Sequence, residues 1–173
     1  MNNIAQQEVP VALLTKSYCF FGKLTTGGRR LQDILNDSLT DYLHLRGVQV
    51  GTTLDSASAV EAVDKCIIAK QNVLLALLQV DSHEAPLKRQ NYRVRRDFCE
   101  AFMVLGPVRV RGAIHLPRLS NNPTAILSRD LKNFFAVTDA SISYGMAAEG
   151  ALETSVALVN KSELLAFHVD GGV

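Results

Sequence analysis

Apolar and polar side chains alternate with a period of two along several short stretches of the chain. This pattern is typical of strands that are half buried. It predicts strands over residues 18–24 and 108–116. Residues 9–14, 42–50, 98–105 and 134–143 are expected to be strands as well. In residues 108–116 the alternation is clearest: the predicted inward positions are Val108, Val110, Ile114 and Leu116, and the predicted outward positions are Arg109, Arg111 and His115.

Two short segments carry helix signals instead of strand signals. Leu31, Ile34 and Leu35 have the i, i+3, i+4 spacing of an apolar helix face. Further along, Asn122 is a suitable N-cap, and Pro123 suits a first helical turn. The sequence therefore predicts one short helix after the second strand of each half.

A hairpin is predicted at the end of each half, because an Asn at a two-residue turn tolerates the positive φ that such turns need. The first hairpin would join 65–70 to 73–80 through 71–72, and the second would join 155–159 to 163–169 through 160–161.

The chain is similar to itself in four blocks that keep their order. Residues 18–24 lie over 108–114 at an offset of 90, 31–36 over 123–128 and 41–50 over 133–142 at 92, and 66–76 over 156–166 at 90. In the first block Gly22 falls on Gly112, and a glycine inside a strand usually marks a bulge or a close backbone approach. The similarity predicts an internal duplication.

The expected fold class is α+β and mostly β. It consists of two tandem, pseudo-symmetric, barrel-like antiparallel modules, each with one short helix. The expected order along the chain is a tail over 1–8, a first repeat over 9–80, a basic linker over 81–97, a second repeat over 98–169 and a tail over 170–173.

Composition excludes some classes of protein. Of 173 residues 47% are hydrophobic and 20% are charged, and the net charge is +1, so the chain is too apolar and too weakly charged for a disordered protein. Near-neutral charge also argues against a surface that is wholly adapted to nucleic acid.

The cysteines and the N-terminus favour a cytoplasmic protein. Cys19, Cys66 and Cys99 are odd in number, lie far apart and form no C-x-x-C pair, which suggests reduced thiols in apolar surroundings. The first residues lack the features of a secretory signal, and the longest apolar run, 73–78, is too short to span a membrane.

Motifs for catalysis or metal binding are not found in the sequence. The four histidines form no H-x-x-x-H or H-E-x-x-H pattern, and no G-x-S-x-G elbow is present. We therefore expect a protein that is not an enzyme and that has no cofactor and no metal.

Basic residues are unevenly distributed. Residues 1–86 have seven Lys and Arg against nine Asp and Glu, whereas residues 87–173 have eleven against eight. Such a patch can neutralise phosphates, so a regulatory nucleic-acid-binding module is the alternative hypothesis. The candidate anion contacts are Arg29, Arg30, Lys88, Arg89, Arg93, Arg95, Arg96, Arg109 and Arg111.

The leading hypothesis is a non-enzymatic interaction or scaffold module that self-associates or binds a protein partner. It depends on residues 73–78, which are apolar on both faces, whereas an antiparallel strand usually has one wet face. The residues predicted to form either a self-association surface or the core between repeats are Leu74, Leu75, Leu77 and Phe167.

Three motifs resemble a poorly characterised bacterial tandem β-rich domain. Residues 27–36 read GGRRLQDILN, residues 134–140 read FFAVTDA and residues 159–161 read VNK. The domain has the pattern GRRLSDxLN, FLxLTDA and VNK. The resemblance implies a β-rich fold, and it implies no catalytic residues because the domain has no established activity.

Overall fold

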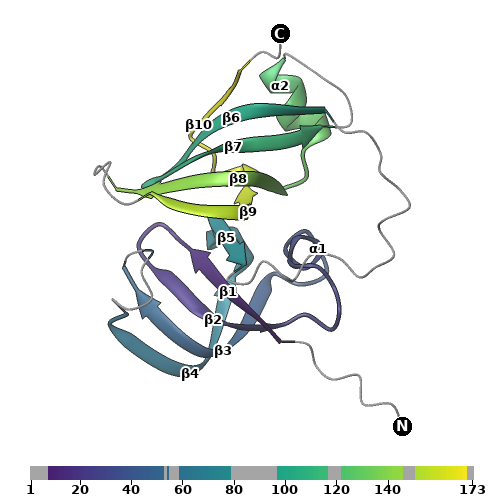
Figure 1. The fold of residues 1–173 in the computed structure, drawn as a ribbon. Helices are drawn as coiled ribbons and strands as arrows, with labels where there is room; N and C mark the ends of the chain where they lie inside the picture. Colours follow the sequence, from purple (N-terminus) through teal and green to yellow (C-terminus); the bar gives the residue numbers. More distant parts are fainter. Residues whose placement is uncertain are drawn as a thin grey trace. The chain divides into compact units, whose positions relative to one another are not determined.

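The computed structural model describes residues 8–52, 54, 59–78, 97–116, 122–145 and 151–170 (Figure 1). The chain divides into two compact units, Met1–Glu84 and Ala85–Val173. All strand pairs described within these units are antiparallel. The expected linker and repeat boundaries near residues 80–97 stay a prediction, because residues 79–96 lie outside the described part.

In the first unit the strands follow the order β5-β1-β2-β3-β4. A short helix lies between β2 and β3, and a 3-10 turn precedes β5. The elements are β1 (Glu8–Leu14), β2 (Cys19–Thr25), α1 (Leu31–Leu35), β3 (Tyr42–Gly51), β4 (Glu61–Ala69), η2 (Lys70–Asn72) and β5 (Leu75–Leu78).

The second unit has the same kinds of element in the same order, and its strands follow the order β10-β6-β7-β8-β9. Here the helix continues into a π-helical turn. The elements are β6 (Asp97–Leu105), β7 (Val108–Leu116), α2 (Pro123–Ala125), η5 (Ile126–Asp130), β8 (Phe134–Tyr144), β9 (Leu152–Asn160), η6 (Lys161–Glu163) and β10 (Ala166–Val169).

The mostly β class and the two short helices are confirmed. Asn122 caps α2 as predicted, because its side-chain oxygen accepts a hydrogen bond from the Ala125 N–H at 3.2 Å, and Pro123 follows it. The alternation along β7 is confirmed too. Its four predicted inward residues are fully buried, Arg111 and His115 are exposed, and Arg109 is half buried.

The predicted hairpins are wrong. β4 pairs with β3 and β5 pairs with β1, so β4 and β5 stand at opposite ends of the strand order of their unit. The connection between them crosses one end of the sheet: the Lys70 N–H donates to the Asp41 oxygen next to β3, and the Leu74 N–H donates to the Leu14 oxygen at the end of β1. In the second unit β9 pairs with β8 and β10 with β6, and the N–H groups of Lys161 and Leu165 make the corresponding bonds.

This connection requires the five strands of each unit to curl. In a flat sheet the outer two of five strands lie about 19 Å apart. Residues 70–74 are too short for that distance, because three of them form a 3-10 turn with a rise of about 2 Å each. No ladder joins β4 to β5 among the described residues, so the expected barrel-like closure is wrong: the sheet is curled and open.

A bulge lies opposite each of the two strand glycines. The register shifts between Phe21 and Lys23, and again between Arg111 and Ala113, so that β3 and β8 each carry one extra residue. The left-handed positions are Gly47 with φ 56° in β3 and Asp139 with φ 49° in β8. Because bulges bend a strand and increase its twist, they help these sheets to curl. The prediction from Gly22 and Gly112 is confirmed.

We predict that Gly112→Ala destabilises the second unit. A Cβ at Gly112 would lie 2.7 Å from the Thr138 carbonyl oxygen and 2.8 Å from Val137 Cγ1. Overpacking of this kind lowers the free energy of unfolding by about 1–3 kcal/mol.

Gly22→Ala is the matched control, because a Cβ there is 3.2 Å from the Arg46 oxygen and needs only small shifts. Urea unfolding of both variants measures the difference. Equal stabilities would contradict the close approach at Gly112.

Candidate functional site

Arg109 and Arg111 lie on β7 beside β6, and Arg111 contacts an aromatic ring of that strand. Phe102 is opposite Arg111 in the ladder, and the Arg111 guanidinium carbon lies 4.6 Å from the centre of the Phe102 ring. Arg109 Nη2 donates to the Gly145 oxygen at 3.4 Å. The structure thus places these two predicted cations on neighbouring outward positions of one strand.

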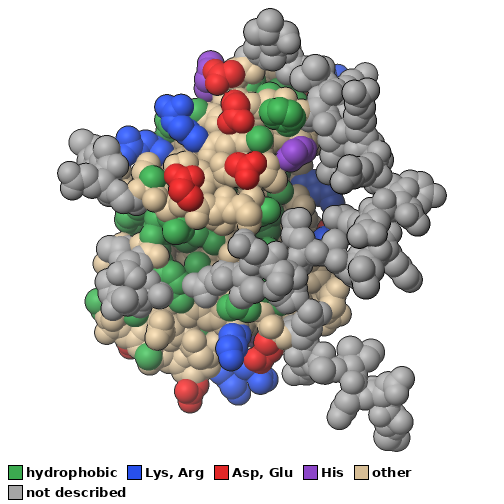
Figure 2. Space-filling model, viewed as in Figure 1, with side chains coloured by type: hydrophobic (Ala, Val, Ile, Leu, Met, Phe, Trp, Pro, Cys, Tyr) green, Lys and Arg blue, Asp and Glu red, His purple; other side chains and the backbone are tan. Residues whose placement is uncertain are grey.

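Acidic groups share the surface of this unit. Glu100 is exposed on β6 between Phe98 and Phe102. On the face that Figure 2 shows, the described acidic and basic side chains of this unit are mixed rather than gathered by sign. The predicted linker cations lie outside the described residues: Lys88, Arg89, Arg93, Arg95 and Arg96. Nucleic-acid binding by this set of residues stays a prediction.

Arg29 and Arg30 come just before α1, and they differ in surroundings. Arg29 forms an ion pair with Asp37, with 2.7 Å between Nη1 and Oδ2, and its Nη2 donates to the Asp33 carbonyl oxygen at 3.3 Å. Arg30 is exposed at the N-cap position. Arg29 therefore has a structural partner in Asp37. The anion contact expected at Arg29 stays a prediction.

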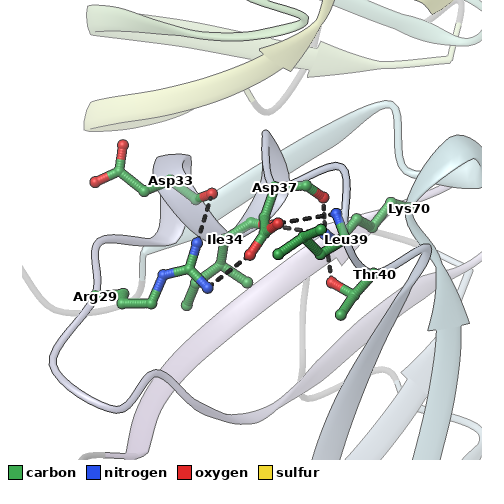
Figure 3. A network of polar contacts seen from close by, with 7 residues as sticks. All are labelled: Arg29, Asp33, Ile34, Asp37, Leu39, Thr40 and Lys70. Carbon is green, nitrogen blue, oxygen red and sulfur yellow. Dashed lines mark hydrogen bonds and ion pairs between the residues drawn. The ribbon is translucent and has the colours of Figure 1, made fainter.

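Lys70 is a buried cation of the first unit whose ammonium group donates three hydrogen bonds (Figure 3). Its side chain is buried, and Nζ donates to the carbonyl oxygens of Ile34 at 2.7 Å and Asp37 at 2.9 Å and to Thr40 Oγ1 at 2.9 Å. The last carbonyls of a helix lack partners within the helix, and an ammonium group satisfies them well. Lys70 therefore ties η2 to the chain that follows α1.

Lys161 does the same in the second unit. Its Nζ donates to the carbonyl oxygens of Leu127 and Leu131, each at 2.8 Å. Both lysines are the first residue of a 3-10 turn, so Lys70 corresponds to Lys161 at an offset of 91. The sequence blocks had matched Lys70 with Asn160 at an offset of 90, which differs by one residue from the correspondence of the two turns.

Burial and hydrogen bonding shift two pKa values in this network. Burial lowers the pKa of Lys70, although the nearby Asp37 acts in the opposite direction. The Leu39 N–H and then Arg29 lower the pKa of Asp37, because both favour the carboxylate. The Asp37 contacts therefore stabilise the fold above the ordinary carboxyl range near pH 4, and this contribution is lost as the pH falls through the lowered pKa.

We predict that Lys70→Met lowers the free energy of unfolding by about 1–3 kcal/mol, because it removes the ammonium donor from the Ile34 and Asp37 carbonyls and the Thr40 hydroxyl. Of these acceptors the Ile34 oxygen keeps a 3.3 Å hydrogen bond from the Asp37 N–H. Lys23→Met is the control, since Lys23 is exposed on β2 and a surface change is usually worth less than about 0.5 kcal/mol. Chemical denaturation gives both values. A Lys70→Met protein as stable as the control would show that the Nζ contacts contribute nothing.

The apolar residues predicted for self-association are mostly inside the protein. Leu74, Leu75 and Leu77 are buried, and in the ladder with β1 Leu75 is opposite Leu14. Phe167 on β10 is half buried. Burial favours the core role for the three leucines over the interface role, and the self-association assigned to these residues stays a prediction.

The edge strand β4 is a feature that the sequence analysis missed. Within the described residues its one neighbour is β3, and it is nine residues long. Ile67 on β4 is 62% exposed, and Val60, which precedes β4, is 73% exposed. Period-two alternation could not reveal the edge, because a sequence shows which residues form a strand but not which strand is last in the sheet.

The thiols of Cys19 and Cys99 have raised pKa values, and the described residues include no candidate metal-binding group. Among these residues, no group of three or more His, Cys, Asp and Glu side chains could hold a metal ion. All three cysteines are free, and burial raises the pKa of Cys19 to about 11 and that of Cys99 above its ordinary value. No described helix has the length and apolar character needed to cross a membrane.

Comparisons with known proteins add no relative. No family model, curated protein or solved structure matches the chain. The resemblance of the three sequence motifs to the bacterial domain stays a prediction.

Proposed function

We propose that the protein is a non-enzymatic interaction module that self-associates, and that it does so through the edge of the sheet at β4. One observation carries the proposal: a nine-residue strand has hydrogen-bond partners on one side only within the described structure. The other side of such a strand presents backbone N–H and C=O groups that another strand can pair with.

The side chains of β4 support this role. Most of them are exposed or half buried. Ile67 is opposite His44 of β3, and the exposed Tyr42 lies two residues before His44 on β3, on the same face of the sheet. Exposed apolar side chains on an edge strand favour pairing with another chain. A partner strand would cover part of this apolar surface.

The two units are, in this proposal, tandem copies of one module. Support comes from the equal order of elements, from the bulges opposite Gly22 and Gly112, and from the turns that begin at Lys70 and Lys161. β4 is the last strand in the order of the first unit, and we assign its free edge to the partner.

The first test measures the molar mass of the full chain by light scattering coupled to size exclusion, in low and in high salt, with absorbance at 260 and 280 nm. We expect a multiple of 18.9 kDa that salt changes little, because backbone pairing and apolar contacts are only weakly screened. The 260 nm signal should show no excess; with no Trp and four Tyr, bound nucleic acid would be conspicuous.

Two results would contradict the proposal. A monomer at every concentration would overturn self-association. A mass that falls in high salt together with a 260 nm excess would favour the nucleic-acid alternative instead, because phosphate contacts weaken steeply with ionic strength.

A further inference from the structure

We infer that the occupant of the β4 edge is β4 of a second copy of this chain, paired antiparallel with Val63 opposite Val63. The inference rests on the proposed function and deepens it, since it names the partner and the register. Dimers of identical chains are usually symmetric about a two-fold axis, with the same surface used on both copies.

Two-fold symmetry leaves few registers to compare. In an antiparallel pair of identical strands the axis is perpendicular to the sheet, so one residue faces its own copy and the others pair symmetrically around it. A centre at Asp64 or Lys65 puts like charges directly opposite each other, which is destabilising. A centre at Ala62 or Cys66 puts no charged residues opposite each other.

A centre at Val63 pairs unlike charges twice. Glu61 of each copy is then opposite Lys65 of the other, and Asp64 is opposite Ala62. Both Glu61 and Lys65 are exposed, and neither forms an ion pair within the described residues. Of the registers centred from Glu61 to Cys66, this one alone puts unlike charges opposite each other.

Lys65 has a further reason to accept a carboxylate from outside. In the ladder it is opposite Arg46 of β3, and two like charges in that arrangement repel. Arg46 has a distant carboxylate, with Nη1 3.8 Å from Glu8 Oε1, and Lys65 has no carboxylate partner among the residues that the structure describes. A Glu61 from a second copy would lie on the free side of Lys65 and offset this repulsion.

The same register also pairs the exposed apolar residues with small or apolar partners. Ile67 is opposite Ala59, and Val60 is opposite Cys66. These pairs extend the ladder from residue 59 to residue 67, about as long as β4 itself. The charges at positions 61 and 65 therefore select the register, and the backbone and apolar contacts supply most of the association.

The test is a charge exchange in the full chain. Glu61→Lys and Lys65→Glu should each weaken dimerisation by about two- to thirtyfold, because each replaces two cross-strand attractions with repulsions. The double variant, E61K with K65E, should restore the dimer. A mixture of the two single variants should form a heterodimer, because both cross-strand pairs then join unlike charges.

Lys23→Glu is the matched control. Lys23 is also opposite Arg46 and exposed, but β2 lies between β1 and β3, so this change should leave the dimer intact. Sedimentation equilibrium measures the dissociation constants, and far-ultraviolet circular dichroism verifies that every variant is folded.

The possible failures are distinguishable. A wild-type chain that dimerises while both single reversals leave its dissociation constant unchanged would overturn the β4 register and leave self-association standing. Weakening by both single variants without recovery in the double variant would overturn the Glu61–Lys65 pairing. A wild-type chain that stays monomeric would overturn self-association itself.

Discussion

The connection from β4 to β5 sets the form of the first unit. It leads from one end of the strand order to the other within five residues, so the sheet has to curl. The bulge opposite Gly22 supplies bending in the middle of the sheet. Lys70 holds the connection in place, because its ammonium group joins the turn to the carbonyl of Ile34 in the last turn of α1 and to that of Asp37 just after the helix. The second unit meets the same requirement with Gly112 and Lys161.

A sheet that curls without closing keeps an edge, and this links the fold to the proposed function. Closure would give every backbone group of β4 a partner inside its own unit. The ladder that the structure describes for β4 lies on the β3 side alone, and its exposed side chains include apolar Ile67 as well as the charged Glu61 and Lys65. Backbone pairing supplies affinity at such an edge, and the charges select one register among several.

Local features were predictable from the sequence, whereas features that depend on distant residues were not. Alternation located β7, and capping chemistry located α2 through Asn122. An Asn near a turn suggested hairpins, but which strands pair depends on where the whole sheet places them. Lys70 was missed because its acceptors lie 30 to 36 residues away in the sequence. The β4 edge was missed for the same reason, since strand order is a property of the sheet.

Hydrogen exchange of the full chain, followed by mass spectrometry over a range of protein concentrations, tests most directly whether the open edge at β4 is the interaction surface. If a partner strand covers this edge, the backbone amides of residues 60–67 exchange more slowly as the chain associates. Amides of β2, which already has a strand on each side, should exchange at the same rate throughout. Association with no change in the exchange of residues 60–67 would contradict the account, because the partner would then lie elsewhere.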